Sequence, residues 1–249
     1  MRNDGKNEII VGVVLIVICY LAFLSIDIAN IGTWKGLGLG EGWSPILKLT
    51  SIVFCLFLVR FAKSSPSNIR DANLQFIVFI WTIVADYFLL FTYFFAIGIL
   101  IFCGAHLTAI LRYRKKLFLP SLIFFFISWI LFALLKFAGV EISVFYFAAA
   151  IYTILIITVA ITGFCSDQPK INRRLSSVGM ILFLLCDVNV AAFNLLPQES
   201  FIGNMASVLM WAFYLPAQTL LALSTYKCCY CASLKAVKAA ITKSFSSLK

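Results

Sequence analysis

The chain has 249 residues, of which 63% are hydrophobic and 12% are charged, and its mean hydropathy is +1.03. A soluble domain of this length cannot bury so much apolar surface, and soluble proteins average about 25% charged residues. We therefore expect an integral membrane protein and exclude the soluble, fibrous and disordered classes. The apolar runs do not alternate with polar residues, which excludes a transmembrane β-barrel.

Eight apolar runs are long enough to cross a bilayer as helices, which takes about 20 residues each. In chain order they cover residues 9–29, 45–62, 73–92, 94–113, 117–136, 142–163, 176–196 and 203–226. Loops are expected at residues 32–42, 64–71, 112–116, 167–174 and 197–200, and only Tyr93 and its neighbours separate the third run from the fourth. The sequence thus predicts an all-α bundle of eight transmembrane helices over residues 9–226, with an N-terminal segment 1–8 and a basic tail 227–249.

The basic residues support this count of spans. All of them except Lys35, Lys48 and Lys136 lie before the first run, after the last run, in alternate breaks between runs or within three residues of such a break. Because short cytoplasmic loops collect Lys and Arg, both termini are expected to be cytoplasmic. The net charge of +10 then reflects topology and contact with anionic lipid headgroups. No soluble domain is left to present a basic face, so no nucleic-acid partner is expected. The expected membrane is a bacterial inner membrane or, in a eukaryote, the endoplasmic reticulum.

Function is expected among the polar residues inside the spans, because the membrane makes such residues costly. Asp86 and Asp187 stand out, since apolar sequence surrounds each of them and neither has a Lys or Arg within one helical turn. Their spans run in the same direction, so the two carboxyls could face one another at similar depth. In a low-dielectric site they could not both ionise, and one protonated and one ionised carboxyl would suit acid and base catalysis. The alternative is two separate aspartates that pack their helices.

Further polar residues fall on helical faces that could line the same pocket. Tyr214 and Gln218 share a face of the eighth run, and His106 lies on the fourth. Asn194 shares a face with Asp187 on the seventh run, where it either reaches the pocket or joins two helices by a hydrogen bond.

The outer ends of the spans and the last span carry three more residues of interest. Lys48 either forms an ion pair with Asp27 or contacts a phosphate. Pro216 should kink the last span and free backbone carbonyls that a cavity could use.

A chain with one histidine cannot form a His-rich metal site, and neither a glycine-rich phosphate loop nor a serine elbow is present. No metal or cofactor is expected.

Four stretches of the chain carry a family resemblance. They are ADYFLLFTYFFAIGILIFCGAHLTAI, GMILFLLCDVNVAAFNLLP, FYLPAQTLLALS and the lysine-bearing ILKLTSIVF. In content, order and spacing they resemble the motifs of the YhhN family, the lysoplasmalogenases, and with the eight-span plan the resemblance covers essentially the whole chain.

The chain also departs from the family pattern at single positions. Ala85 stands where the family usually has Gly before the first aspartate, and Cys186 stands where it has Ser before the second. Leu49 replaces the Pro that often follows the lysine. The usual Asn after the second aspartate is displaced by one residue, to Asn194, and Tyr214 alone remains of a tyrosine pair.

The resemblance implies hydrolysis of the vinyl-ether bond of a lysoplasmalogen, an alkenyl-glycerophosphocholine or alkenyl-glycerophosphoethanolamine. The products are a fatty aldehyde and glycerophosphocholine or glycerophosphoethanolamine, so the expected partners are a lysophospholipid substrate and membrane lipids. A rival interpretation is a proton-coupled transporter or a lipid-binding membrane protein without enzymatic activity. The expected catalytic residues are Asp86 and Asp187, and the expected substrate-binding residues are Lys48, His106, Asn194, Tyr214 and Gln218.

Overall fold

A computed structural model describes residues 4–29, 42–62, 68–197 and 200–226 of the chain. Across these ranges the chain forms eight α-helices and no strand, and each helix is long and apolar enough to cross a membrane. The helices are α1 (Asp4–Ala29), α2 (Trp43–Ala62), α3 (Ile69–Phe91), α4 (Phe95–Tyr113), α5 (Lys115–Phe137), α6 (Val144–Phe164), α7 (Lys170–Leu195) and α8 (Phe201–Leu223). The prediction of eight helical spans is confirmed for the described ranges, and the cytoplasmic position of the termini stays a prediction.

Several helices extend beyond the apolar runs, so three expected loops are partly wrong. Helix α7 begins at Lys170 inside the predicted loop 167–174, and α4 and α5 are separated only by Arg114. Helix α3 begins at Ile69, where the side chain of Asn68 accepts a hydrogen bond from the backbone N–H of Arg70. Lys and Arg are good helix formers and continue a helix beyond its apolar run. Hydrophobicity alone therefore places the starts of α3, α5 and α7 too late in the sequence. Most of loop 32–42 and the whole tail 227–249 lie outside the described residues.

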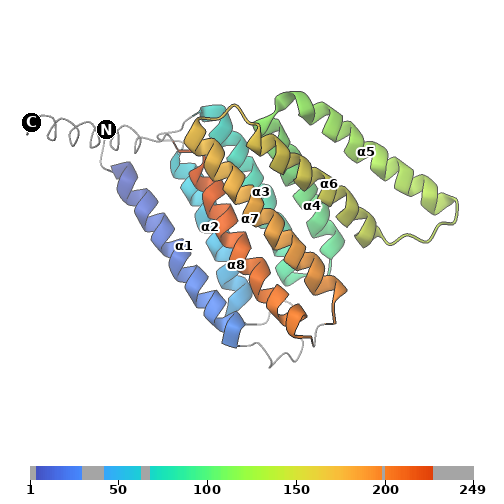
Figure 1. Cartoon of the computed structure of the whole chain (residues 1–249), viewed down its shortest axis with the longest axis horizontal. Helices are drawn as coiled ribbons and strands as arrows, with labels where there is room; N and C mark the ends of the chain where they lie inside the picture. Colours follow the sequence, from blue (N-terminus) through green and yellow to red (C-terminus); the bar gives the residue numbers. More distant parts are fainter. Residues whose placement is uncertain (1–3, 30–41, 63–67, 198–199, 227–249) are drawn as a thin grey trace, which may run out of the picture.

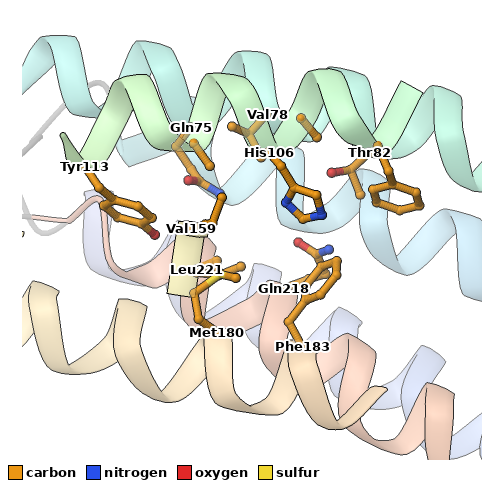
Figure 2. Close-up of a pocket in the computed structure, with 13 residues that line it drawn as sticks. Gln75, Val78, Thr82, His106, Tyr113, Val159, Met180, Phe183, Gln218 and Leu221 are labelled. Carbon is orange, nitrogen blue, oxygen red and sulfur yellow. The ribbon is translucent and has the colours of Figure 1, made fainter. Parts of the chain in front are cut away.

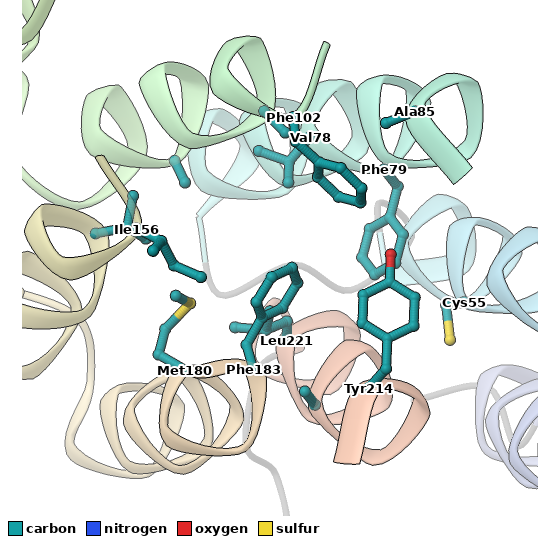
Figure 3. Close-up of a cluster of buried hydrophobic side chains, with 14 of the residues drawn as sticks. Cys55, Val78, Phe79, Ala85, Phe102, Ile156, Met180, Phe183, Tyr214 and Leu221 are labelled. Atoms are coloured by element: carbon teal, nitrogen blue, oxygen red, sulfur yellow. The ribbon is translucent and has the colours of Figure 1, made fainter. Parts of the chain in front are cut away.

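The core lies mainly between six of the helices. Helices α1 and α5 lie at opposite edges of the bundle (Figure 1), and Phe132 is the one buried residue of α5. Helix α3 packs on α4, α4 on α6, and α7 on α8. Most buried side chains of the core come from α2, α3, α4, α6, α7 and α8 (Figure 3), and α1 adds Ile16 and Phe23. Much of the outer surface is apolar, as a lipid-facing surface should be.

Helices α7 and α8 approach closely at Gly179. A Cβ atom at this position would lie 3.1 Å from Leu221 Cγ and 3.2 Å from the Ala217 carbonyl oxygen. Small residues allow membrane helices to pack this tightly. The contact fixes α7 against α8, and these two helices carry Asp187 and Tyr214.

Pro216 frees a carbonyl, as predicted, but helix α1 uses it instead of a cavity. Proline has no N–H and therefore leaves the carbonyl four residues earlier, that of Ala212, without its helical donor. The hydroxyl of Tyr20 on α1 donates to that oxygen at 3.0 Å. The proline thus provides a hydrogen bond that attaches α1 to α8.

A buried ion pair joins the helices at the end of the bundle where α3 begins and α4 ends, which we call the Arg112 end. Arg112 Nε donates to Asp71 Oδ1 at 2.9 Å, and Arg112 Nη2 donates to Asp71 Oδ2 at 2.8 Å. Nη2 also donates to Ser224 Oγ at 2.9 Å, and Gln168 Nε2 donates to Asp71 Oδ1 at 2.8 Å. The loops expected at residues 64–71 and 112–116 are therefore wrong for Asp71 and Arg112, which lie in α3 and α4, where each side chain neutralises the other inside the bundle.

Candidate functional site

The first predicted catalytic residue, Asp86, lies on α3 in the core and is 3% exposed. Its partner is Tyr214 of α8, whose hydroxyl lies 3.0 Å from Oδ1 and 2.8 Å from Oδ2. Tyr214 is buried as well. We call these residues the Asp86/Tyr214 pair.

The second predicted catalytic residue, Asp187, has a tyrosine partner of its own. The hydroxyl of Tyr152 on α6 donates to Asp187 Oδ2 at 2.9 Å. Asp187 is on α7 and is half-buried. The Asp187/Tyr152 pair therefore repeats the carboxyl and phenol arrangement of the Asp86/Tyr214 pair, with a different pair of helices.

Aromatic rings connect the two pairs. The Phe183 ring lies 5.4 Å from the Tyr214 ring and 5.8 Å from the His106 ring, centroid to centroid. The His106 ring lies 4.9 Å from the Tyr152 ring. Cys186, a buried residue, directly precedes Asp187 on α7. The site is therefore a continuous cluster, although each carboxyl has its own hydroxyl donor.

Neither catalytic candidate has a basic partner in the described part of the chain. The buried lysine and the buried arginine there, Lys48 and Arg112, form ion pairs with Asp27 and Asp71 instead. Apolar surroundings disfavour charge on a carboxyl that has no cation beside it. Such an environment suits a carboxylic acid that must hold a proton until it is needed.

A small cavity of about 20 Å³ lies beside the pairs and is lined by residues of α3, α4, α6, α7 and α8. Figure 2 shows the side chains of His106 and Gln218 pointing toward one another across it, with Thr82 and Gln75 along α3. Apolar residues form most of the remaining wall. Asp86 lies four residues beyond Thr82 on α3, so it is one helical turn, or about 6 Å along the axis, from a residue that lines the cavity.

Lys48 lies near the end of the bundle that is opposite the Arg112 end. Its Nζ atom is 2.8 Å from Asp27 Oδ2, and Ser44 Oγ donates to Asp27 Oδ1 at 2.6 Å. The ammonium also lies 4.9 Å from the centre of the Trp211 ring, which packs edge-on against Tyr214. The ion pair expected from the sequence is therefore present, and contact with a phosphate stays a prediction.

The structure brings most of the predicted site residues together, with Lys48 at one end of the cluster and Asn194 outside it. Tyr214 contacts Asp86, while His106 and Gln218 line the cavity. Asn194 lies in the last turn of α7, is exposed, and donates to the Val190 carbonyl of its own helix at 2.8 Å. Asn194 therefore does not belong to the cluster around the two acid and tyrosine pairs.

Sequence reasoning missed Tyr152, Gln75 and Thr82. Gln75 and Thr82 lie 11 and 4 residues before Asp86, which is helical spacing, so the periodicity around Asp86 contains the signal for both. Tyr152 is one of several hydroxyl side chains in a very apolar run, and only the contact across helices reveals its role. In the ranges given above, no three His, Cys, Asp or Glu side chains come close enough to hold a metal ion.

Comparison with known proteins identifies the family. The model of the YhhN family matches residues 43–225, from the start of α2 to just beyond α8. The match includes both acid and tyrosine pairs, the cavity and Lys48. No curated protein and no solved structure matches the chain. Because the family match covers most of its length, the chain belongs to the YhhN family.

Proposed function

We propose that the protein is a lysoplasmalogenase that hydrolyses the vinyl-ether bond of an alkenyl-glycerophosphocholine or alkenyl-glycerophosphoethanolamine. The observation that carries the proposal is the presence of two carboxyls in the membrane-spanning core, Asp86 and Asp187, each bonded to a tyrosine hydroxyl and neither paired with a base. Family membership supports the same assignment. The products are a fatty aldehyde and the glycerophospho-alcohol.

The chemistry of a vinyl ether fits two carboxyls. A carboxylic acid protonates the outer alkene carbon, which leaves an oxocarbenium ion on the carbon bonded to oxygen. Water adds to that carbon, a proton leaves the water, and the resulting hemiacetal collapses to aldehyde and alcohol. In this scheme one of Asp86 and Asp187 donates the proton, and the other stabilises the cation.

The tyrosine hydroxyls have a specific part in this scheme. A carboxylate without a counter-ion in apolar surroundings needs a hydrogen-bond donor when it has lost its proton. Tyr214 and Tyr152 are such donors, at 2.8 and 2.9 Å from the carboxyl oxygens. They stabilise the ionised carboxyls without neutralising them, which leaves the negative charge available to the cation.

Binding of the lysophospholipid is assigned to the residues around these pairs. His106 and Gln218 hold the reacting water or a glycerol hydroxyl, and Tyr214 orients Asp86. Lys48 is the candidate for the phosphate, because it lies at one end of the cluster beside Trp211. An apolar alkenyl chain is compatible with the apolar residues around the pairs.

The decisive experiment is aldehyde release from lysoplasmalogen by the detergent-purified protein, with an ester lysophospholipid as the control substrate. Aldehyde from the vinyl ether alone, and none from a folded Asp187→Asn variant, is the expected result. Folded wild-type protein that releases no aldehyde, but shows substrate flux driven by a proton gradient in liposomes, would contradict the hydrolase and support the transporter. A hydrolase needs no gradient, so the two assays separate the two functions.

A further inference from the structure

The orientation of the Gln75 side-chain amide is fixed by Arg112. Arg112 Nη1 donates to Gln75 Oε1, and the whole Gln75 residue is 2% exposed. A guanidinium carries only donors, so the amide must turn its oxygen toward Arg112 and its NH₂ group away from it. Gln75 therefore offers a donor, not an acceptor, to whatever lies on its other side.

Arg112 is itself held in place. It makes two parallel hydrogen bonds to Asp71, of 2.9 and 2.8 Å, and a third to Ser224 Oγ of 2.9 Å. A bidentate arginine and carboxylate pair fixes the plane of the guanidinium. Rotation of the Gln75 amide would break its charge-assisted bond to Arg112, so the direction of the NH₂ group is well determined.

Two buried nitrogen atoms on the wall of the cavity have no hydrogen-bond partner among the residues that the structure describes. They are Nε2 of Gln75 and Nε2 of His106, whose residues are 2% and 5% exposed. Buried polar atoms nearly always have a partner, and a water molecule is the usual one where protein atoms are missing. The cavity of about 20 Å³ has room for about one water molecule. Thr82 and Gln218 line the same space, so further partners are available (Figure 2).

The cavity has a defined position relative to both carboxyls. Asp86 follows Thr82 by four residues on α3, and Asp187 follows Phe183 by four residues on α7. Each carboxyl is therefore one turn, about 6 Å, along its helix from a residue that lines the cavity. The His106 ring, which lines the cavity, also contacts the ring of Tyr152, the donor to Asp187.

We propose that this cavity holds the water molecule that attacks the substrate, with Gln75 Nε2 and His106 Nε2 as its fixed contacts. The inference rests on the proposed function and names the source of its nucleophile. The water oxygen bonds to the oxocarbenium carbon, and one water proton passes to His106 Nε2. Return of that proton to the carboxylate that protonated the alkene restores the acid. One water is consumed for each vinyl ether cleaved.

The water site is tested without any activity measurement by radiolytic labelling in ¹⁸O-water. Met180 lines the cavity and is 3% exposed, so radicals formed from a cavity water are expected to oxidise it while bulk radicals reach it poorly. We expect several-fold less oxidation of Met180 in Gln75→Leu than in the wild type. Met210, which does not line the cavity, serves as the internal reference. Equal oxidation of Met180 in the two proteins would overturn the site.

The role of the water is tested by competition with methanol. Methanol captures the oxocarbenium ion as a methyl acetal, whereas water gives the aldehyde. We expect the wild type to form almost only aldehyde, and Gln75→Leu to raise the acetal share at least five-fold while total consumption of the vinyl ether falls about ten-fold. A purely structural role of Gln75 would lower the total consumption and leave the product ratio unchanged, and that result would overturn the proposal.

Two further variants keep the test interpretable. Gln75→Glu retains an oxygen for Arg112 and removes the NH₂ donor, so it should fold even if Gln75→Leu does not, and it should show the same shift in products. Asn189→Leu on α7 is a matched polar-to-apolar control, because Asn189 bonds to the Leu185 carbonyl of its own helix at 2.7 Å. A wild-type protein that labels Met180 but cleaves no vinyl ether would refute the proposed function and leave the water site intact.

Discussion

The Tyr214 hydroxyl lies within hydrogen-bond distance of both oxygens of Asp86, 3.0 Å from Oδ1 and 2.8 Å from Oδ2. A single hydroxyl proton serves one oxygen at a time, so Tyr214 can bond to whichever oxygen lacks a proton. Asp86 can therefore carry a proton on one oxygen, transfer it, and keep a hydrogen bond in both states.

The first prediction concerns this pair. Asp86→Asn should lower aldehyde release at least 100-fold, because the amide cannot supply the proton that general acid catalysis requires. Tyr214→Phe should lower it about ten-fold, because the ionised carboxyl loses a donor worth roughly 1–3 kcal/mol. The matched control for Tyr214→Phe is Tyr87→Phe, because Tyr87 follows Asp86 on α3 and its side chain is half exposed. Full turnover by Asp86→Asn at wild-type protein levels would remove Asp86 from the chemistry.

The second prediction concerns Asp187 and Tyr152 on the other side of the cluster. Asp187→Asn should also lower aldehyde release at least 100-fold, and Tyr152→Phe about ten-fold, since the hydroxyl of Tyr152 donates to Asp187 at 2.9 Å. The steady-state rate is measured for the two single variants and for Asp86→Asn with Asp187→Asn. If both carboxyls serve one step, the double variant is hardly slower than either single one. If the fold-loss of rate in the double variant equals the product of the two single losses, the two aspartates act independently.

Helix number and approximate position could be read from the sequence, because a bilayer needs about 20 apolar residues for each span. The ends of α3 and α7 could not, since hydrophobicity does not mark where polar residues continue a helix. Helical spacing also placed Tyr214 and Gln218 on one inward face, and both are buried.

Contacts between helices were less accessible to sequence reasoning. The two aspartates appeared as one possible pair, but the structure gives each a tyrosine donor, and Tyr152 lies 35 residues from Asp187 in sequence. Arg112 was assigned to a basic loop because a charge pattern does not show whether a carboxylate lies opposite it. Asp71 meets Arg112 only after α3 and α4 have packed against one another.

The third prediction separates two roles of Lys48. If Lys48 binds the substrate phosphate, Lys48→Met should raise KM about ten-fold with little change in kcat, whereas Asp27→Asn should leave KM unchanged or lower it. If Lys48 serves only the ion pair with Asp27 at 2.8 Å, both variants should lower Tm alike and leave KM alone. Steady-state kinetics together with thermal unfolding in detergent measure both quantities. A raised KM in Asp27→Asn as well would contradict phosphate binding by a freed Lys48.

The last prediction concerns stability at the Arg112 end. Arg112→Met leaves the buried carboxylate of Asp71 without its cation, which should cost roughly 3–5 kcal/mol of unfolding free energy and lower Tm markedly. Adding Asp71→Leu removes the unpaired charge and should recover much of that loss, because apolar residues often replace a buried ion pair without penalty. Both variants lose the Arg112 bond to Gln75 Oε1, so the direction of the Gln75 amide is no longer fixed in either. We therefore expect the double variant to recover thermal stability but not aldehyde release. Recovery of both would show that Arg112 serves the fold alone, and recovery of neither would mean that the helices at this end need the ion pair itself.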